Sequence, residues 1–289
     1  MRFLSSLRHV PQQLAAPRPR RISRSGPDLR RTLNSAADSS ARTPMSDSPL
    51  PVGILFPMEF EAEPTWRTIG GRSRPEAGLE TLKGSWQGLP VVSARIGMGH
   101  AGLDQKVEAW LNEHPCRAVV LAGLAGALDP AWDKGDLSSF HAEAWPGFAV
   151  WARTKPAVRA GKWHTAHAII ETGLAKLELG RKTACGLVEM EWDYVAAACR
   201  RKDVPLVGLR AVSDHAEQLL PADLFLLGCD AVTGKSTPVK LGLHLALRPW
   251  RLRELLPAVG GCLQAREVMS KALGEFLDWM SGGMKGLRD

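Results

Sequence analysis

The stretch from residue 187 to residue 214, LVEMEWDYVAAACRRKDVPLVGLRAVSD, constrains the fold of this chain more than any other part. Its apolar spacing, followed by the basic run 200–202, is typical of an amphipathic helix with positive charge near its C-terminus. Pro205 blocks further helix, and the short apolar run 206–212 suits a buried parallel strand. The stretch therefore predicts a helix that leads into a strand of an open α/β sheet.

Charged and polar side chains stand at both ends of this predicted unit. Glu189 and Glu191 precede the helix, and Ser213 and Asp214 end the strand that also carries Arg210. Ligands in an open α/β sheet bind outside the carboxyl ends of the strands. These five side chains are therefore candidates for a binding or catalytic site.

Two blocks of this unit resemble the purine nucleoside phosphorylase/nucleosidase superfamily. Its members carry a V-E-M-E helix start, found here at residues 188–191, and an R-A-[IV]-S-D strand end, found at 210–214. The blocks look most like those of the methylthioadenosine/S-adenosylhomocysteine nucleosidases. The resemblance covers about residues 51–220. It implies a single-domain, three-layer α/β/α fold with a central mixed, mostly parallel twisted sheet.

The resemblance assigns chemistry to three carboxylates. Cleavage of an N-ribosidic bond passes through an oxocarbenium-like sugar, so an enzyme must stabilise a cation, help the purine leave and aim a nucleophile. Asp214 is implied to be the acid at N7 of the base. Glu191 is implied to bind the 2′- and 3′-hydroxyls and to favour the cation. Glu61 is implied to activate the attacking water, with ordinary first-turn helix charge as the alternative.

The other positions that match the superfamily's nucleoside-binding residues are Gly97, Gly123, Ile169, Ile170, Glu189, Met190, Arg210 and Ser213. We expect Arg210 and Ser213 to position the acids, with surface pairing and capping as the alternative. Glu189 is expected to support the helix start rather than to touch substrate. Ile169 stands where the nucleosidases have a stacking aromatic ring, so stacking on the purine is expected to be weaker or to come from Trp192.

The sequence favours hydrolysis over phosphorolysis. Leu124 stands where phosphorylases of the superfamily have a serine, and Leu121 stands where the hexameric ones have an arginine. A leucine offers neither a hydrogen bond nor a charge to an anion. A phosphate-dependent phosphorylase and an inactive nucleoside-binding module stay open as alternatives. The joint presence of Glu61, Glu191 and Asp214 speaks against the inactive module.

The positive charge of the chain is concentrated in its first fifty residues. They hold nine arginines, no lysine and three aspartates, a net charge of +6 out of the +7 of the whole chain. The nearly neutral charge of residues 51–289 therefore gives little support for nucleic-acid binding by this part of the chain. We expect residues 1–48 to be a disordered Arg/Ser/Pro-rich tail, and 49–289 to be the nucleosidase-like domain. A transit peptide, a true start at Met45 and a nucleic-acid arm are the alternatives for the tail.

Membrane spans and metal sites have no support in the sequence. No apolar stretch approaches the roughly 18–20 residues that a span needs. The five cysteines are scattered and form no C-x-x-C, and no histidines stand at ligand spacing, so a zinc site is not expected. The resemblance implies no cofactor. It implies a cytoplasmic homodimer that acts on a purine nucleoside with water, or phosphate, as co-substrate.

Further elements are predicted on either side of the 187–214 unit. Strands are expected at 51–56, 79–86, 90–96 and 117–122, the second and third forming a hairpin, and a helix is expected at 101–113. Beyond the unit, residues 218–237 are expected to be irregular, and helices at 240–247, 252–259 and 262–280 to form a C-terminal extension. The side chains of Trp145, Trp151 and Trp163 are expected to form one small cluster.

The C-terminal extension also bears on the substrate. Residues 248–255 carry an R-P-x-x-L-x-x-L pattern that resembles the hopanoid-associated phosphorylase branch, which is associated with removing adenine from an adenosyl-hopane lipid intermediate. Segment 136–167 is shorter than in the nucleosidases, which opens the predicted 5′ side. We therefore expect an adenine nucleoside with a bulky or apolar 5′ substituent. A methylthioadenosine/adenosylhomocysteine nucleosidase, with the opening closed by the C-terminal extension, is the alternative.

Overall fold

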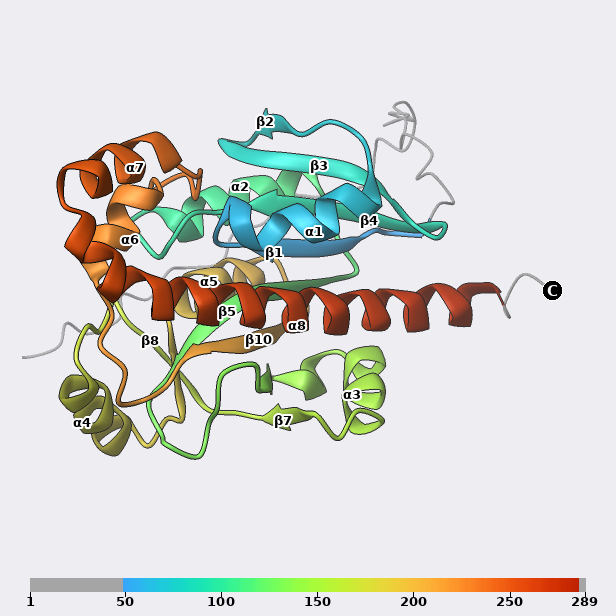
Figure 1. Cartoon of the computed structure of the whole chain (residues 1–289). Coiled ribbons are helices and arrows are strands. Elements are labelled where there is room, and N and C mark those ends of the chain that lie inside the picture. Colours follow the sequence, from blue (N-terminus) through green and yellow to red (C-terminus); the bar gives the residue numbers. More distant parts are fainter. Residues whose placement is uncertain (1–48, 286–289) are drawn as a thin grey trace, which may run out of the picture. The chain divides into compact units, whose positions relative to one another are not determined.

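A ten-stranded mixed sheet lies at the centre of residues 49–285, the part of the chain that this computed structural model describes (Figure 1). The strand order is β2-β3-β4-β1-β5-β10-β6-β7, and β9 pairs with β5 and β8. Four strands run parallel in the middle: β4 (Leu89–Arg95), β1 (Val52–Phe56), β5 (Ala118–Ala127) and β10 (Leu206–Asp214). Their carboxyl ends therefore meet at one edge. The predicted tail, 1–48, lies outside the described residues.

Further strands widen the sheet around this parallel centre, some in antiparallel and some in parallel pairs. The outer strands are β2 (Arg74–Glu76), β3 (Leu79–Trp86), β6 (Leu137–Phe140), β7 (Val158–Ala160), β8 (Trp163–Thr165) and β9 (Leu187–Glu189). Strands β1 and β10 are buried at every residue, which explains their continuous apolar runs. The predicted hairpin is confirmed as the antiparallel pair β3–β4.

Helices cover both faces of the sheet and confirm the predicted three layers. Helices α1 (Glu59–Ile69), α3 (Pro146–Arg153) and α8 (Leu252–Lys285) share one apolar core with it. Helices α2 (Leu103–Glu113) and α5 (Trp192–Arg201) share the other. In Figure 1, α1 and α8 lie in front of the sheet and α2 and α5 behind it. The remaining helices are α4 (Gly173–Thr183), α6 (Ala222–Gly228), α7 (Pro238–Leu247) and the 3₁₀ turns η1 (Ala142–Ala144) and η2 (Pro249–Arg251).

Helix α8 is continuous, and the prediction of two separate helices at 252–259 and 262–280 was wrong. Pro257 lies in its second turn, and Gly260 and Gly261 follow without a break. A Cβ on Gly261 would collide with the backbone carbonyl of Ser213, so the missing side chain lets the helix pack directly on β10. That packing outweighs the roughly 1 kcal/mol by which glycine disfavours a helix.

Two other local predictions were also wrong. The segment 218–237 is not irregular throughout, because α6 forms within it and buries Leu224 against the rest of the protein. The tryptophans do not form one cluster. Trp145 and Trp151 pack on Phe276 of α8, whereas Trp163 belongs to the core on the other face. In both cases tertiary packing decided what the local sequence could not.

Phe276 anchors α8 on the sheet, because it is fully buried and its ring lies 5.0–5.3 Å from the rings of Trp145, Phe148 and Trp151. We expect Phe276→Ala to lower the free energy of unfolding by about 3–5 kcal/mol, because truncation leaves a cavity among these rings. Urea unfolding followed by tryptophan fluorescence measures the change. Leu256→Ala, at an exposed position of the same helix, is the control and should stay within about 0.5 kcal/mol. Similar losses in both variants would contradict this anchoring role.

Candidate active site

A pocket of about 170 Å³ lies beyond the carboxyl ends of β1, β4, β5 and β10. Eight predicted site residues line it: Glu61, Ile169, Ile170, Glu189, Met190, Glu191, Ser213 and Asp214. Arg210, Gly97 and Gly123 are not among the lining residues. A larger hollow of about 620 Å³ runs along the outer side of α1, past Trp66 and Arg95, but it holds none of the predicted site residues.

Glu61 reaches the pocket from the first turn of α1, directly after β1. One of its oxygens, Oε2, accepts a hydrogen bond from the backbone N–H of Met58 at 2.9 Å. The other, Oε1, accepts one from the N–H of Leu124 at 2.8 Å. Burial raises the pKa of Glu61 to about 7, although the nearby Arg210 and these two N–H groups oppose the rise. The carboxylate is therefore held rigidly and titrates close to neutral pH.

The two predicted glycines allow close approaches beneath the pocket. A Cβ on Gly123 would run into the guanidinium of Arg210 and lie 2.9 Å from an oxygen of Glu61. Gly97 has a φ of 79° and packs against the backbone of Val232, where a side chain has no room. Gly123 thus leaves room for Arg210 beside Glu61, and Gly97 leaves room for the chain at Val232.

Arg210 links the two glutamates of the VEMEW block. Its guanidinium, fully buried in β10, donates from Nη2 to Glu189 Oε2 at 3.0 Å and to Glu191 Oε2 at 2.8 Å. Buried charges of this kind are tolerated when they are paired and hydrogen-bonded. The alternative of surface pairing for Arg210 is excluded, because the residue has no exposed surface.

Glu189 and Glu191 have different surroundings. Glu189 Oε2 accepts the backbone N–H groups of Glu191 and Trp192 at 2.9 and 2.8 Å, so this side chain supports the start of α5 as expected. Its other oxygen accepts the Thr165 hydroxyl at 2.6 Å. Glu191 has fewer partners and faces the pocket. Burial raises the pKa of Glu191 to about 8, while Arg210 opposes the rise.

Asp214 ends β10 and meets a residue that the sequence interpretation missed. Ser213 Oγ donates to Asp214 Oδ1 at 2.6 Å, in keeping with its predicted positioning role. The ammonium of Lys176, from α4, lies 2.5 Å from Asp214 Oδ2, and both side chains are buried. Lys176 stands between apolar and charged residues in an ordinary helical pattern. No motif marked it in advance.

Apolar side chains complete the pocket opposite the acids. The predicted site residues Ile169 and Ile170 come from the loop before α4, and Leu220 and Phe225 come from the segment around α6. Trp192 points elsewhere: its ring packs against His141 and Phe140 at centroid distances of 5.5 and 4.7 Å, and it does not line the pocket. The suggestion that Trp192 stacks on the base was therefore wrong.

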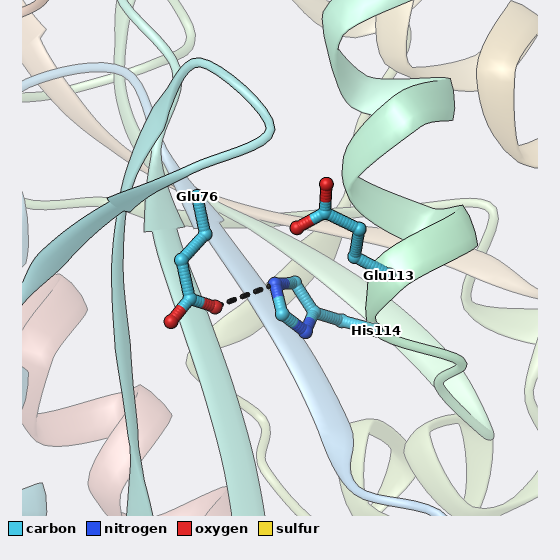
Figure 2. Close-up of side chains that lie close together, drawn as sticks. All are labelled: Glu76, Glu113 and His114. Atoms are coloured by element: carbon cyan, nitrogen blue, oxygen red, sulfur yellow. Dashed lines mark ion pairs between the residues drawn. The ribbon is translucent and has the colours of Figure 1, made fainter.

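A group of potential metal ligands lies far from these residues in the fold. Among the described residues, Glu76, Glu113 and His114 bring their ligand atoms within 4.8 Å of one another (Figure 2). His114 Nε2 lies 3.0 Å from Glu76 Oε2, and the ammonium of Lys83 lies 2.6 Å from the same oxygen. The ammonium of Lys83 already balances the charge of Glu76, so this carboxylate needs no metal ion to neutralise it. None of the described helices has the length and apolarity to cross a membrane.

Known proteins share the fold that carries this site. The family model of the phosphorylase superfamily matches residues 51–139, and no curated protein matches the chain. Among solved structures, futalosine hydrolase of Helicobacter pylori is 17% identical with a TM-score of 0.59, over 79% of this chain and 97% of that chain.

Nucleosidases have the same fold. The 5′-methylthioadenosine/S-adenosylhomocysteine nucleosidase of Helicobacter pylori is 17% identical over 79% of this chain and 98% of that chain, with a TM-score of 0.59. The nucleosidase of Colwellia psychrerythraea, solved with adenine, is 17% identical over 80% of this chain and 96% of that chain, with a TM-score of 0.60. The predicted α/β fold and the resemblance to the superfamily are confirmed.

Removal of Arg210 should destabilise the protein in a pH-dependent way. We expect Arg210→Met to lower the free energy of unfolding by about 3–5 kcal/mol at pH 8, because it leaves buried carboxylates without their cation. At pH 5.5 the loss should be smaller. Burial already raises the pKa of Glu61 to about 7 and that of Glu191 to about 8, and loss of the cation raises both further. At pH 5.5 both side chains are therefore neutral with or without Arg210, and its removal leaves no charge on them unpaired.

Urea titrations at the two pH values measure this difference. Arg201→Met is the matched control, because Arg201 is 42% exposed and pairs with Asp104 and Glu108 at the surface. Its loss should be below about 1 kcal/mol at both pH values. An Arg210→Met variant whose loss is the same at pH 5.5 and pH 8 would show that the carboxylates are not the source of the cost.

Proposed function

We propose that this protein, which shares its fold with the nucleosidases, hydrolyses the N-glycosidic bond of an adenine nucleoside with an apolar 5′ substituent. The observation that carries the proposal is the convergence of Glu61, Glu191 and Asp214 on one pocket, although they come from α1, the start of α5 and β10. The three carboxyl groups match the three tasks of the reaction: water activation, sugar binding and protonation of the base.

The charge of the pocket favours a cationic sugar over an anionic co-substrate. Four acids, Glu61, Glu189, Glu191 and Asp214, line it together with one lysine, and Arg210 lies behind them. Negative charge stabilises a developing oxocarbenium ion and repels phosphate. Leu121 is fully buried in the core and Leu124 offers only its backbone N–H to Glu61. Water is therefore the better co-substrate.

Glu61 is placed to prepare that water. Its two oxygens are held by the N–H groups of Met58 and Leu124, so a water at the pocket side meets a carboxylate of fixed orientation. A general base works best when its pKa lies near the operating pH, and burial raises the pKa of Glu61 to about 7. Its ionised form accepts a proton from water as C1′ is attacked.

Glu191 and Asp214 serve the two halves of the substrate. Arg210 takes one oxygen of Glu191, and the side chain faces the pocket, where it accepts hydrogen bonds from the 2′- and 3′-hydroxyls. The ionised form of Glu191, which becomes more populated as the pH approaches its pKa of about 8, puts negative charge beside the carbon that becomes cationic. Asp214 donates to N7 of the purine, so that the base leaves as a neutral molecule. Ser213 keeps Asp214 in the orientation that this transfer requires.

The apolar wall of the pocket supports an apolar 5′ substituent. Met98, Leu220 and Phe225 form this wall, and α6 contributes the last of them. A volume of about 170 Å³ is smaller than the roughly 300–1,000 Å³ of most small-molecule sites, so we infer that this wall opens when a substrate binds. An adenosyl-hopanoid and a methylthio- or homocysteinyl-adenosine differ in how far this wall has to open.

A cytoplasmic homodimer stays a prediction of the resemblance.

Release of adenine from 5′-methylthioadenosine, measured with and without phosphate, tests the proposed reaction. We expect turnover without phosphate and no more than a two-fold change when it is added. Asp214→Asn should lower kcat by about 10²–10⁴-fold, because an amide cannot deliver the proton. Asp133→Asn, at a side chain that is 79% exposed, is the control and should retain activity. Strict dependence on phosphate would identify a phosphorylase, and a fully active Asp214→Asn would remove this residue from the mechanism.

A series of 5′-alkylthioadenosines tests the substituent. We expect kcat/KM to rise with chain length, because burial of a methylene contributes about 0.8 kcal/mol, or up to roughly fourfold per carbon, until the groove is filled. Initial rates of adenine release at low substrate concentration measure kcat/KM directly. If methylthioadenosine is the best member and each added carbon lowers the rate, α6 acts as a fixed wall and the alternative substrate class is correct.

A further inference from the structure

The ammonium of Lys176 is held entirely by acceptors around the candidate acid. It lies 2.5 Å from Asp214 Oδ2, 3.1 Å from the carbonyl of His215 and 3.0 Å from the carbonyl of Gln218. A lysine ammonium has three donors, so all of them are used. The side chain is 1% exposed and borders the same pocket as Asp214. The roles proposed above for the three carboxylates leave this lysine without a function.

The burial of Lys176 sets it apart within its own helix. Helix α4 has one buried residue, and that residue is Lys176. Lysines are almost never fully buried unless they are paired, because removing the charge from water is costly. The start of α4 also packs closely on the chain that follows Asp214: a Cβ on Gly173 would lie 2.6 Å from the Glu217 carbonyl. The helix is thus docked on the strand end with a charged side chain as its buried contact.

This arrangement bears on how Asp214 can act as an acid. Asp214 Oδ2 accepts a hydrogen bond from the ammonium of Lys176, and the proposed reaction needs a proton at N7 of the purine. Lys176 and Ser213 both donate to Asp214, and the ammonium of Lys176 is the stronger acid of the two, so it is the better source of that proton. Ser213 occupies the other oxygen of Asp214 at 2.6 Å, so the carboxylate cannot rotate away from this pair.

We propose that Lys176 is a positioning residue that acts through Asp214, orienting the carboxylate and supplying the proton that it passes to the purine. The inference rests on the proposed hydrolysis. As the C1′–N9 bond breaks, its electron pair moves into the purine. A proton leaves Lys176 Nζ for Asp214, and Asp214 gives a proton to N7. The attacking water gives its proton to Glu61. Exchange with solvent returns a proton to Lys176 and removes one from Glu61, so the cycle balances.

The experiment compares two leaving groups in the wild type and in Lys176→Met. Adenine in 5′-methylthioadenosine needs a proton to leave, whereas 4-nitrophenolate in a 4-nitrophenyl β-riboside leaves without one. We expect Lys176→Met to lower kcat for the adenine substrate by about 10²–10³-fold and to change kcat for the nitrophenyl substrate by less than about fivefold. A lysine that only holds α4 in place would affect both substrates alike.

Further variants keep the result decisive. Lys182→Met, at an exposed position of the same helix, is the matched control and should behave as wild type on both substrates. Lys176→Gln keeps donors for the two carbonyls but not the charge, so it replaces Lys176→Met if circular dichroism shows that variant to be unfolded. In the double variant Lys176→Met/Asp214→Asn, the loss of kcat on the adenine substrate should be smaller than the product of the two single-variant losses, because both residues serve one proton transfer.

The outcomes separate this inference from the proposed function. If the wild type cleaves neither substrate, the proposed hydrolysis fails. If the wild type cleaves both and the Lys176 variants lose activity equally on both, or keep full activity on adenine release, the hydrolysis stands and the role of Lys176 is overturned. A selective loss with adenine as the leaving group supports the proton supply.

Discussion

The ion pairs of Arg210 are the interaction on which the site depends. A guanidinium without exposed surface sits in β10, and it holds one glutamate from the end of β9 and one from the N-cap of α5. It also lies close to Glu61, at the point where Gly123 leaves room for both. Without this central cation, the acids from separate segments would repel one another within the pocket.

The acids of the pocket are held by different partners. Glu61 is held by backbone N–H groups, Glu191 by Arg210, and Asp214 by Lys176 and Ser213. Arg210 approaches from behind, within the protein, whereas Lys176 borders the pocket beside Asp214. Such division of labour among neighbouring carboxyl groups is how one site can contain both a base and an acid near neutral pH.

The parallel strands could be predicted from the sequence, because continuous apolar runs report directly on burial, and Asp214 stands at the end of one of them. The roles of Glu61 and Glu191 came from the resemblance to the superfamily, because a glutamate in the first turn of a helix is ordinary when it is taken alone. Lys176 could not be found in this way. Its role depends on where α4 docks, and a single lysine in a helix is ordinarily solvated. The continuity of α8 was hidden for a related reason: Gly260 and Gly261 indicate a helix end unless one knows that the backbone of Ser213 lies against them.

That contact also makes α8 a structural link between the strand end at the pocket and the β3–β4 hairpin. From Gly261, which rests on the strand end beside Asp214, the helix runs away from the pocket along the sheet (Figure 1). Its side chain Asp278 accepts hydrogen bonds from Trp86 and Gln87 at the turn of the β3–β4 hairpin, both at 2.7 Å. About seventeen residues separate these two attachment points, roughly 25 Å at 1.5 Å per residue. A label or surface tether placed near the end of α8 would therefore sit well clear of substrate entry while remaining rigidly connected to the pocket floor.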